Sequence, residues 1–222
     1  MKVLIGMERH GRTRDAFLAL GHDAISCDIL PATAPGPHYQ GDVWEIVEEG
    51  WDLAIFHPTC TFLTNSAEWA YGDGPYHQKV KPDTPVGAER RALRESAIAE
   101  VERIADLHKR GVVKRLCIEN PVGVLSARFR KPDQIIQPYE FGDDASKATC
   151  LWLYDLPPLE PTEYFQPRML VWEQGKRKVL KRWGNQTESG QSNVTPSDDR
   201  WDIRSETFPG IADAFASQWG SL

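Results

Sequence analysis

The sequence of 222 residues lacks any long apolar run, and its uncharged apolar stretches extend over only a handful of residues. A membrane-spanning helix needs about 20 such residues, so no membrane partner is expected. The first residues, MKVLIGMERHGR, contain an apolar run too short for a signal peptide and no small-residue cleavage pattern. These absences predict a protein that stays in the cytoplasm.

Cysteine pairs are also missing. The four cysteines, Cys27, Cys60, Cys117 and Cys150, lie far apart and form no CxxC or Cys/His cluster. This spacing argues against a structural zinc site, so no metal is expected. A reducing cytoplasm disfavours disulfides. Each cysteine is therefore either a small core residue, which is the commoner case, or a reactive thiol.

An excess of positive charge is the third feature that the chain lacks. The formal net charge is −6, with 26 basic and 32 acidic residues. A uniformly basic coat for nucleic acid is therefore excluded. A local basic patch remains compatible with this balance.

What is present is a pattern of alternating strands and helices. Hydrophobic residues make up 41% of the chain, enough for a core, and the length predicts a single domain over residues 1–222. Predicted strands cover residues 2–7, 24–28, 51–56 and 114–119, and predicted helices cover residues 12–20, 87–110 and 208–219. The alternation indicates an α/β fold with a mainly parallel sheet and helices on both faces. Residues 134–141 and 149–154 add two strands that could pair antiparallel at the sheet edge.

Polar residues follow four of the predicted strands. Ligands of open parallel sheets bind beyond the carboxyl ends of the strands, so we expect these residues to converge on one site. The four segments are GMERHG at 6–11, CD at 27–28, HPTCT at 57–61 and ENP at 119–121.

Two of these residues form a chemically useful pair. Cys60 follows a buried strand and a proline, where its thiolate could act as a nucleophile for carbon. Glu119 follows another predicted strand, where a low dielectric could hold its carboxyl protonated as an acid. Together they suit conjugate addition to an electron-poor ring, in which the acid protonates a ring nitrogen. The structural alternatives are a core cysteine and a turn-capping glutamate.

Two aspartates suit a nucleoside. Asp28 ends the second predicted strand, the usual place for a carboxylate that accepts from ribose hydroxyls. Asp42 could accept from an adenine amino group. Each aspartate could instead cap a turn or a helix. The first loop, GMERHGR, does not match GxGxxG, so a dinucleotide site is not supported.

These segments, in this order, resemble the compact, phage-type DNA (cytosine-5)-methyltransferases over residues 2–154 and 204–220. GMERHGR is similar to the loop of that family that binds S-adenosylmethionine, HPTC to its Pro-Cys nucleophile loop, and ENP to its Glu-Asn-Val segment. The segments YEFG at 139–142 and PGIADAFA at 209–216 resemble the family's later regions. Lys147 and Thr149 stand where the family has two arginines.

The resemblance implies a Rossmann-like methyltransferase fold and a covalent mechanism. Cys60 would add to carbon 6 of cytosine, Glu119 would bind ring nitrogen 3, and Lys147 would supply the cation of the site. S-adenosylmethionine would be the cofactor, and its expected contacts are Gly6, Met7, Glu8, Asp28, Asp42 and Pro58. If the protein is phage-encoded, its location would be the host cytoplasm.

The family's large target-recognition domain is replaced by a short insert, residues 157–203, which we expect to be irregular. Residues 168–183 of the insert carry six basic residues and one acidic residue, so the rest of the chain has a net charge of −11. Trp172 and Trp183 lie among these charges, a pattern that suits phosphate contact and base stacking. The candidate nucleic-acid contacts are Arg168, Lys176, Arg177, Lys178, Lys181 and Arg182.

Three functions therefore compete at this stage. The first is a methyltransferase for cytosine in duplex or single-stranded DNA, and the second is an enzyme on the same scaffold that modifies free pyrimidine nucleotides. The third is a non-catalytic nucleic-acid-binding relative, against which the presence of both Cys60 and Glu119 argues. The acidic bulk and the short insert favour the nucleotide enzyme, whereas the basic segment favours the polymer.

Overall fold

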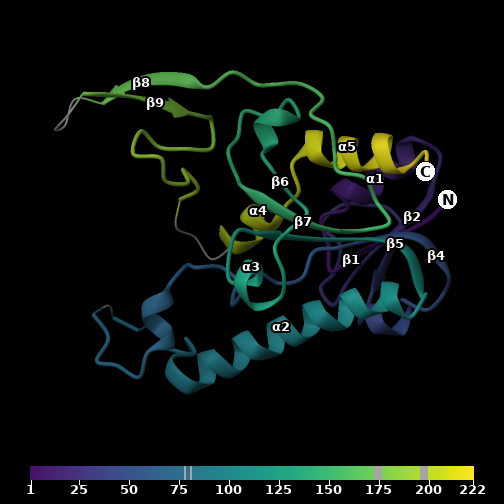
Figure 1. Ribbon diagram of the computed structural model, residues 1–222, viewed down its shortest axis with the longest axis horizontal. Coiled ribbons are helices and arrows are strands. Elements are labelled where there is room, and N and C mark those ends of the chain that lie inside the picture. The colour runs from purple at the N-terminus through teal and green to yellow at the C-terminus, as the bar shows by residue number, and fades with distance from the viewer. Residues whose placement is uncertain (78, 81, 173–176, 196–199) are drawn as a thin grey trace.

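The computed structural model describes residues 1–77, 79–80, 82–172, 177–195 and 200–222. These residues form a seven-stranded sheet and a separate two-stranded ribbon (Figure 1). The sheet contains β1 (Lys2–Gly6), β2 (Asp23–Asp28), β3 (His38–Gln40), β4 (Trp51–Phe56), β5 (Val113–Pro121), β6 (Gln134–Ile136) and β7 (Thr149–Tyr154). The ribbon contains β8 (Arg168–Trp172) and β9 (Lys178–Arg182).

Helices connect and cover these strands. The α-helices are α1 (Arg12–Ala19), α2 (Gly87–Lys109), α3 (Leu125–Arg128), α4 (Arg200–Ser205) and α5 (Pro209–Trp219). Short 3₁₀ helices are η1 (Val43–Glu45), η2 (Glu68–Tyr71) and η3 (Pro138–Glu140). No helix in the described ranges is both long and apolar enough to cross a membrane.

The sheet has the strand order β3-β2-β1-β4-β5-β7-β6. Strands β1 to β5 are parallel, and β7 runs antiparallel to both β5 and β6. The chain fills the sheet outward from β1 to β3, then returns to place β4 on the other side of β1. This reversal creates a topological switch point between β1 and β4, where open α/β sheets bind their ligands.

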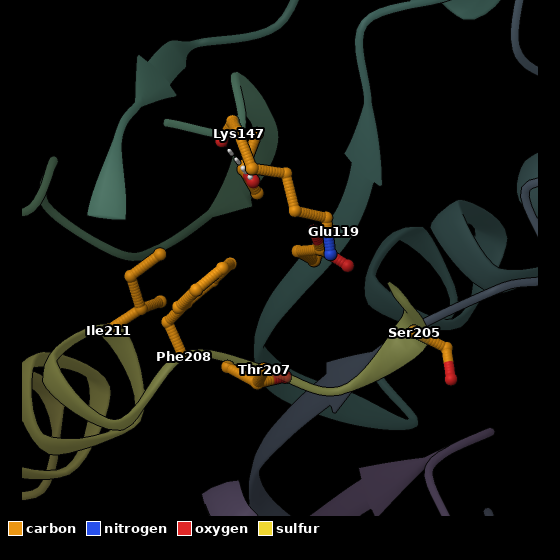
Figure 2. A pocket seen from close by; sticks show the side chains of 7 residues that line it. Glu119, Lys147, Ser205, Thr207, Phe208 and Ile211 are labelled. Atoms are coloured by element: carbon orange, nitrogen blue, oxygen red, sulfur yellow. Dashed lines mark hydrogen bonds between the residues drawn. The ribbon is translucent and has the colours of Figure 1, made fainter. Parts of the chain in front are cut away.

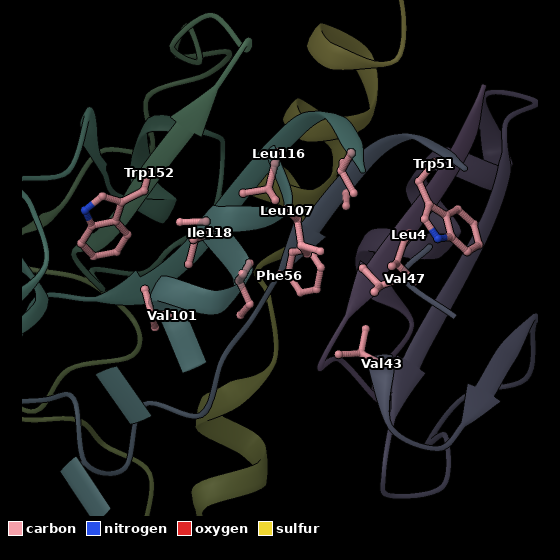
Figure 3. Packing of buried hydrophobic residues seen from close by; sticks show 14 of the residues in the cluster. Leu4, Val43, Val47, Trp51, Phe56, Val101, Leu107, Leu116, Ile118 and Trp152 are labelled. Atoms are coloured by element: carbon pink, nitrogen blue, oxygen red, sulfur yellow. The ribbon is translucent and has the colours of Figure 1, made fainter. Parts of the chain in front are cut away.

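Two hydrophobic clusters cover the two faces of the sheet, because successive side chains of a strand point to opposite faces. On one face, Leu4 and Phe56 pack with Val101 and Leu107 of α2 (Figure 3). On the other face, strand residues such as Ile5 pack with α1 and α5. The predicted α/β architecture, with a mainly parallel sheet, helices on both faces and an antiparallel pair at one edge, is therefore confirmed.

Two differences from the sequence expectations concern the second half of the chain. The strand predicted over residues 134–141 ends at Ile136, because Pro138 begins a 3₁₀ helix there. Residues expected to be an irregular insert instead contain the β8–β9 ribbon and α4. The ribbon lies on the opposite side of the molecule from α2 (Figure 1).

Candidate active site

The register of the sheet brings the four predicted polar segments to one edge. Gly6 of β1 is level with Cys27 of β2 and Phe56 of β4, and Phe56 is level with Ile118 of β5. The residue that follows each of these in the chain therefore lies at the same carboxyl edge. These residues are Met7, Asp28, His57 and Glu119.

Residues 57–64, which we call the 57–64 loop, carry Cys60 away from the end of β4. The backbone N–H of His57 donates to the carbonyl of Gly6 at 3.0 Å. The side chain of Asn120, on β5, donates to the carbonyl of Pro58 at 2.7 Å and is almost fully buried. Cys60 then accepts at its carbonyl from the N–H groups of Leu63 and Thr64, at 2.9 and 3.1 Å. The loop is thus held in place by the two neighbouring strands.

Cys60 is the partly exposed cysteine of the chain, whereas Cys27, Cys117 and Cys150 are fully buried. Burial raises the pKa of the Cys60 thiol, and the nearby Glu119 carboxylate raises it further. Lys147 and Arg204 lower this pKa without outweighing the rise. Cys60 is therefore a thiol at neutral pH, and an attack on carbon must transfer its proton elsewhere.

Glu119 corrects one expectation from the sequence. Burial alone raises the pKa of its carboxyl, as we expected, but His57 and Lys147 outweigh that effect and leave the pKa below its ordinary value. The Nδ1 atom of His57 lies 3.2 Å from Oε2 of Glu119. Glu119 is consequently ionised in the free protein, and it accepts a proton before it can donate one.

Lys147, which the resemblance offers as the cation of the site, lies near Glu119. Glu119, Lys147 and Thr149 line a narrow pocket together with Phe208 and other residues of the segment before and within α5. Figure 2 shows the Lys147 side chain extending toward Glu119. Lys147 Nζ also donates to the carbonyl of Arg204 at 2.9 Å, which fixes the cation beside the carboxylate.

The first loop, residues 6–11, is shaped by close packing. A Cβ atom on Gly6 would lie 2.7 Å from the Phe56 ring, so a larger residue cannot stand there without displacing that ring. Met7 has φ of 61°, a strained conformation for a residue with a side chain. Both carboxylate oxygens of Glu8 accept from the N–H of Gly11, at 2.8 and 3.0 Å. In this structure Glu8 therefore holds the turn into α1.

The two predicted nucleoside carboxylates lie at the same edge of the sheet. Asp28 Oδ1 accepts from the N–H of Leu30 at 2.8 Å, which leaves Oδ2 as the oxygen available to a ligand. Asp42 caps η1, with Oδ1 accepting from the N–H of Trp44 at 3.1 Å. The structure thus gives each aspartate the capping contact that the sequence offered as an alternative, and the ligand roles stay predictions.

A covering segment, residues 200–208, closes over the first loop. Asp202 lies 3.3 Å from Nε2 of His10, and Ser205 Oγ lies 3.1 Å from the same atom. Arg12 also pairs with Glu206. Sequence reasoning missed this segment because it expected residues 157–203 to be irregular and began the last helix only at residue 208.

The predicted basic residues gather on the β8–β9 ribbon. Arg168, Arg177, Lys178 and Lys181 are exposed, whereas Lys176 lies outside the described residues. Arg182 uses its Nε atom to donate to the carbonyl of Glu188 at 2.8 Å. In the described part of the chain, the four exposed basic side chains make no hydrogen bond or ion pair that would compete with a ligand.

The ribbon is joined to the body beside Lys147. Trp183 stacks on Tyr139 with ring centroids 4.4 Å apart. The N–H of Gly184 donates to Asp144 at 2.7 Å, and Ser146 donates its N–H to Asn185 at 2.9 Å. These contacts tie the basic ribbon to the segment that leads into Lys147.

No group of three or more His, Cys, Asp and Glu side chains among the described residues is arranged to hold a metal ion. No protein-family model matches the sequence, and no curated protein matches it. Among solved structures, one titled "Co-crystal structure of WbdD and kinase inhibitor LY294002" is similar with 11% identity and a TM-score of 0.37. That match covers 92% of this chain and 47% of the other, so the chain spans about half the length of that protein. A likeness this weak carries no argument about the site.

Proposed function

We propose that the chain is an S-adenosylmethionine-dependent transferase that methylates carbon 5 of cytosine in DNA through a covalent adduct of Cys60. The observation that carries the proposal is the placement of Cys60 and Glu119 at the carboxyl ends of the adjacent parallel strands β4 and β5, with Lys147 lining the same pocket as Glu119. A nucleophile and a proton-handling group held on neighbouring elements are what addition to a pyrimidine ring requires. The mainly parallel sheet with an antiparallel edge pair agrees with the methyltransferase fold that the sequence resembles.

The addition step balances within the site. The sulfur of Cys60 forms a bond to carbon 6, and the electron pair of the 5,6 double bond moves toward carbon 5 and the conjugated ring. The proton of the thiol passes to the Glu119 carboxylate, which delivers it to ring nitrogen 3. The raised pKa of Cys60 and the lowered pKa of Glu119 fit this order of proton transfers, since the thiol begins protonated and the carboxylate begins ionised. Lys147 stabilises the carboxylate before and after the transfer.

The cofactor region also fits the proposal. The hydroxyl of Thr13, in the first turn of α1, is buried without a partner in the described part of the chain, and the N-cap residue Gly11 has no side chain to satisfy the helix N-terminus. Polar groups of a ligand can complete both. The residues that would hold S-adenosylmethionine are Gly6, Met7, Glu8, Asp28, Asp42 and Pro58. When bound there, the cofactor supplies the methyl group for carbon 5.

The test is transfer of label from S-adenosylmethionine to DNA, RNA and dCMP in separate reactions. The proposal expects label in DNA, on carbon 5 of cytosine, and none with Cys60→Ala. The matched control is Cys27→Ala, which removes a thiol away from Glu119. Label on adenine, or equal transfer by Cys60→Ala, contradicts the proposal.

The exposed ribbon favours a polymer over a free nucleotide. Four phosphate contacts, from Arg168, Arg177, Lys178 and Lys181, give a log–log salt slope of about −3 to −4. A base in a duplex would also have to leave the stack to reach Cys60. A nucleotide has too few phosphates for that slope, so a flat salt profile with turnover of dCMP alone would select the nucleotide enzyme.

A charge-reversed variant tests the ribbon itself. Lys178→Glu with Lys181→Glu should remove most DNA affinity and leave cofactor affinity unchanged. The control is Lys109→Glu with Lys114→Glu, which changes the net charge equally at two exposed positions near the end of α2. Equal loss of DNA affinity in both variants would mean that net charge, rather than the ribbon, attracts the polymer.

A further inference from the structure

His57 is a residue of the site that the sequence analysis left without a role. Its backbone continues β4 into the 57–64 loop, and its side chain is 8% exposed. Its Nδ1 atom faces Glu119 Oε2 at 3.2 Å, whereas its Nε2 atom is buried with no partner among the described residues. A buried polar atom without a partner marks a place that a ligand can complete.

The chemistry of the pair fixes the direction of its hydrogen bond. Glu119 is ionised, and a carboxylate can only accept, so Nδ1 of His57 carries the hydrogen. Oε2 is then occupied by His57, and no described residue donates a hydrogen bond to Oε1. The other titratable groups coupled to Glu119 are Lys147 and the thiols of Cys60, Cys117 and Cys150.

We infer that His57 is a positioning residue, which holds Glu119 through the Nδ1–H to Oε2 hydrogen bond and leaves Oε1 for the ring nitrogen of the substrate. The identity of that ring rests on the proposed function, whereas the coupling of His57 to Glu119 does not. His57 keeps its own proton throughout, because the proton that reaches the ring comes from the Cys60 thiol. The His57 imidazole therefore fixes the position of the Glu119 carboxylate and stabilises its negative charge, but it neither gives up nor accepts a proton.

Two amide variants separate the two nitrogen atoms of the ring. His57→Asn places an amide N–H near the position of Nδ1, so it keeps a donor for Glu119. His57→Gln places its amide near the position of Nε2, so it loses that donor. If His57 is a positioning residue, His57→Asn should keep turnover within about fivefold of the wild type. His57→Gln should lose about tenfold or more in kcat, with little change in KM.

A second readout does not depend on activity. Carbon-13 NMR of glutamate-labelled protein, with the Glu119 signal assigned by its loss in Glu119→Gln, gives the pKa of this carboxyl directly. We expect a lowered pKa in the wild type, and a higher pKa in the Gln variant than in the Asn variant. Nitrogen-15 NMR of the wild type should also show the hydrogen on Nδ1 of His57, a result that needs no variant to fold.

Several outcomes overturn the inference. One is a wild-type His57 without hydrogen on Nδ1, and another is an equal Glu119 pKa in the two variants. Equal loss of kcat in both variants would instead make the imidazole a proton carrier. If the NMR results are as expected but the wild type transfers no methyl group to any substrate, the pairing stands and the proposed function fails.

Discussion

Replacing Glu119 with Gln should make Cys60 more reactive toward a simple alkylating agent while it slows catalysis. In the wild type, burial raises the pKa of Cys60 and the Glu119 carboxylate raises it further. The substitution removes the negative charge and keeps the shape of the side chain. The pKa of the thiol should therefore fall, and more thiolate should be present at neutral pH.

The size of the effect follows from two opposing trends. Each unit by which the pKa falls increases the thiolate fraction about tenfold, while the nucleophilicity of the thiolate declines with a Brønsted coefficient of about 0.4–0.5. The net result is alkylation about three- to fourfold faster per unit of pKa. Turnover should change in the opposite direction, by a loss on the order of a hundredfold, because glutamine cannot relay a proton.

The assay is the rate of iodoacetamide labelling at fixed neutral pH, read by mass spectrometry of the peptide that contains Cys60. Cys27 is fully buried, and the carboxylates that raise its pKa are Asp28, Asp42 and Glu45 rather than Glu119, so it serves as the internal reference. Glu95→Gln is the matched control, since Glu95 is exposed and pairs with Arg128. Unchanged or slower labelling of Cys60 in folded Glu119→Gln would refute the coupling between the two groups.

Three further substitutions test the supports of the site. Asn120→Ala should cost about 1–3 kcal/mol in denaturant unfolding and lower turnover, because it leaves the carbonyl of Pro58 buried without its donor. Gly123→Ala should lower kcat, because its Cβ would collide with the Leu63 carbonyl and displace the 57–64 loop; unchanged kcat would show that the loop tolerates the shift. Asp28→Ala should weaken S-adenosylmethionine binding by roughly ten- to a hundredfold in calorimetry, since a charged acceptor contributes about 1.5–3 kcal/mol.

The frame of the site could be predicted from the sequence because buried strands end where polar residues begin. The strand predicted over residues 51–56 matches β4, and the helix predicted over residues 87–110 matches α2 to within one residue. In a parallel sheet these assignments fix where Cys60 and Glu119 lie, with no knowledge of contacts. The apolar pattern of the chain was therefore enough to predict that Cys60 and Glu119 lie at the same edge of the sheet.

The charge state of Glu119 could not be predicted in the same way. The position of Glu119 at the end of a buried strand predicts burial, which favours the protonated form of its carboxyl. Its partner His57, however, is 62 residues away in the chain, and no periodic pattern connects the two residues. The covering segment is a similar case, because Asp202 reaches His10 through the tertiary fold. Local patterns determine which residues stand at a strand end, whereas side-chain pairing across strands sets their electrostatics.

The central claim is that Cys60 forms a covalent bond to carbon 6 of cytosine. It is tested most directly by incubating the protein and S-adenosylmethionine with DNA that contains 5-fluorocytosine, then mapping any denaturation-resistant adduct by mass spectrometry. Fluorine cannot leave as a proton does, so the adduct should be trapped on the peptide that contains Cys60 and should be absent with Cys60→Ala. Methyl transfer to ordinary DNA without any trapped adduct, or an adduct at another residue, would contradict the claim.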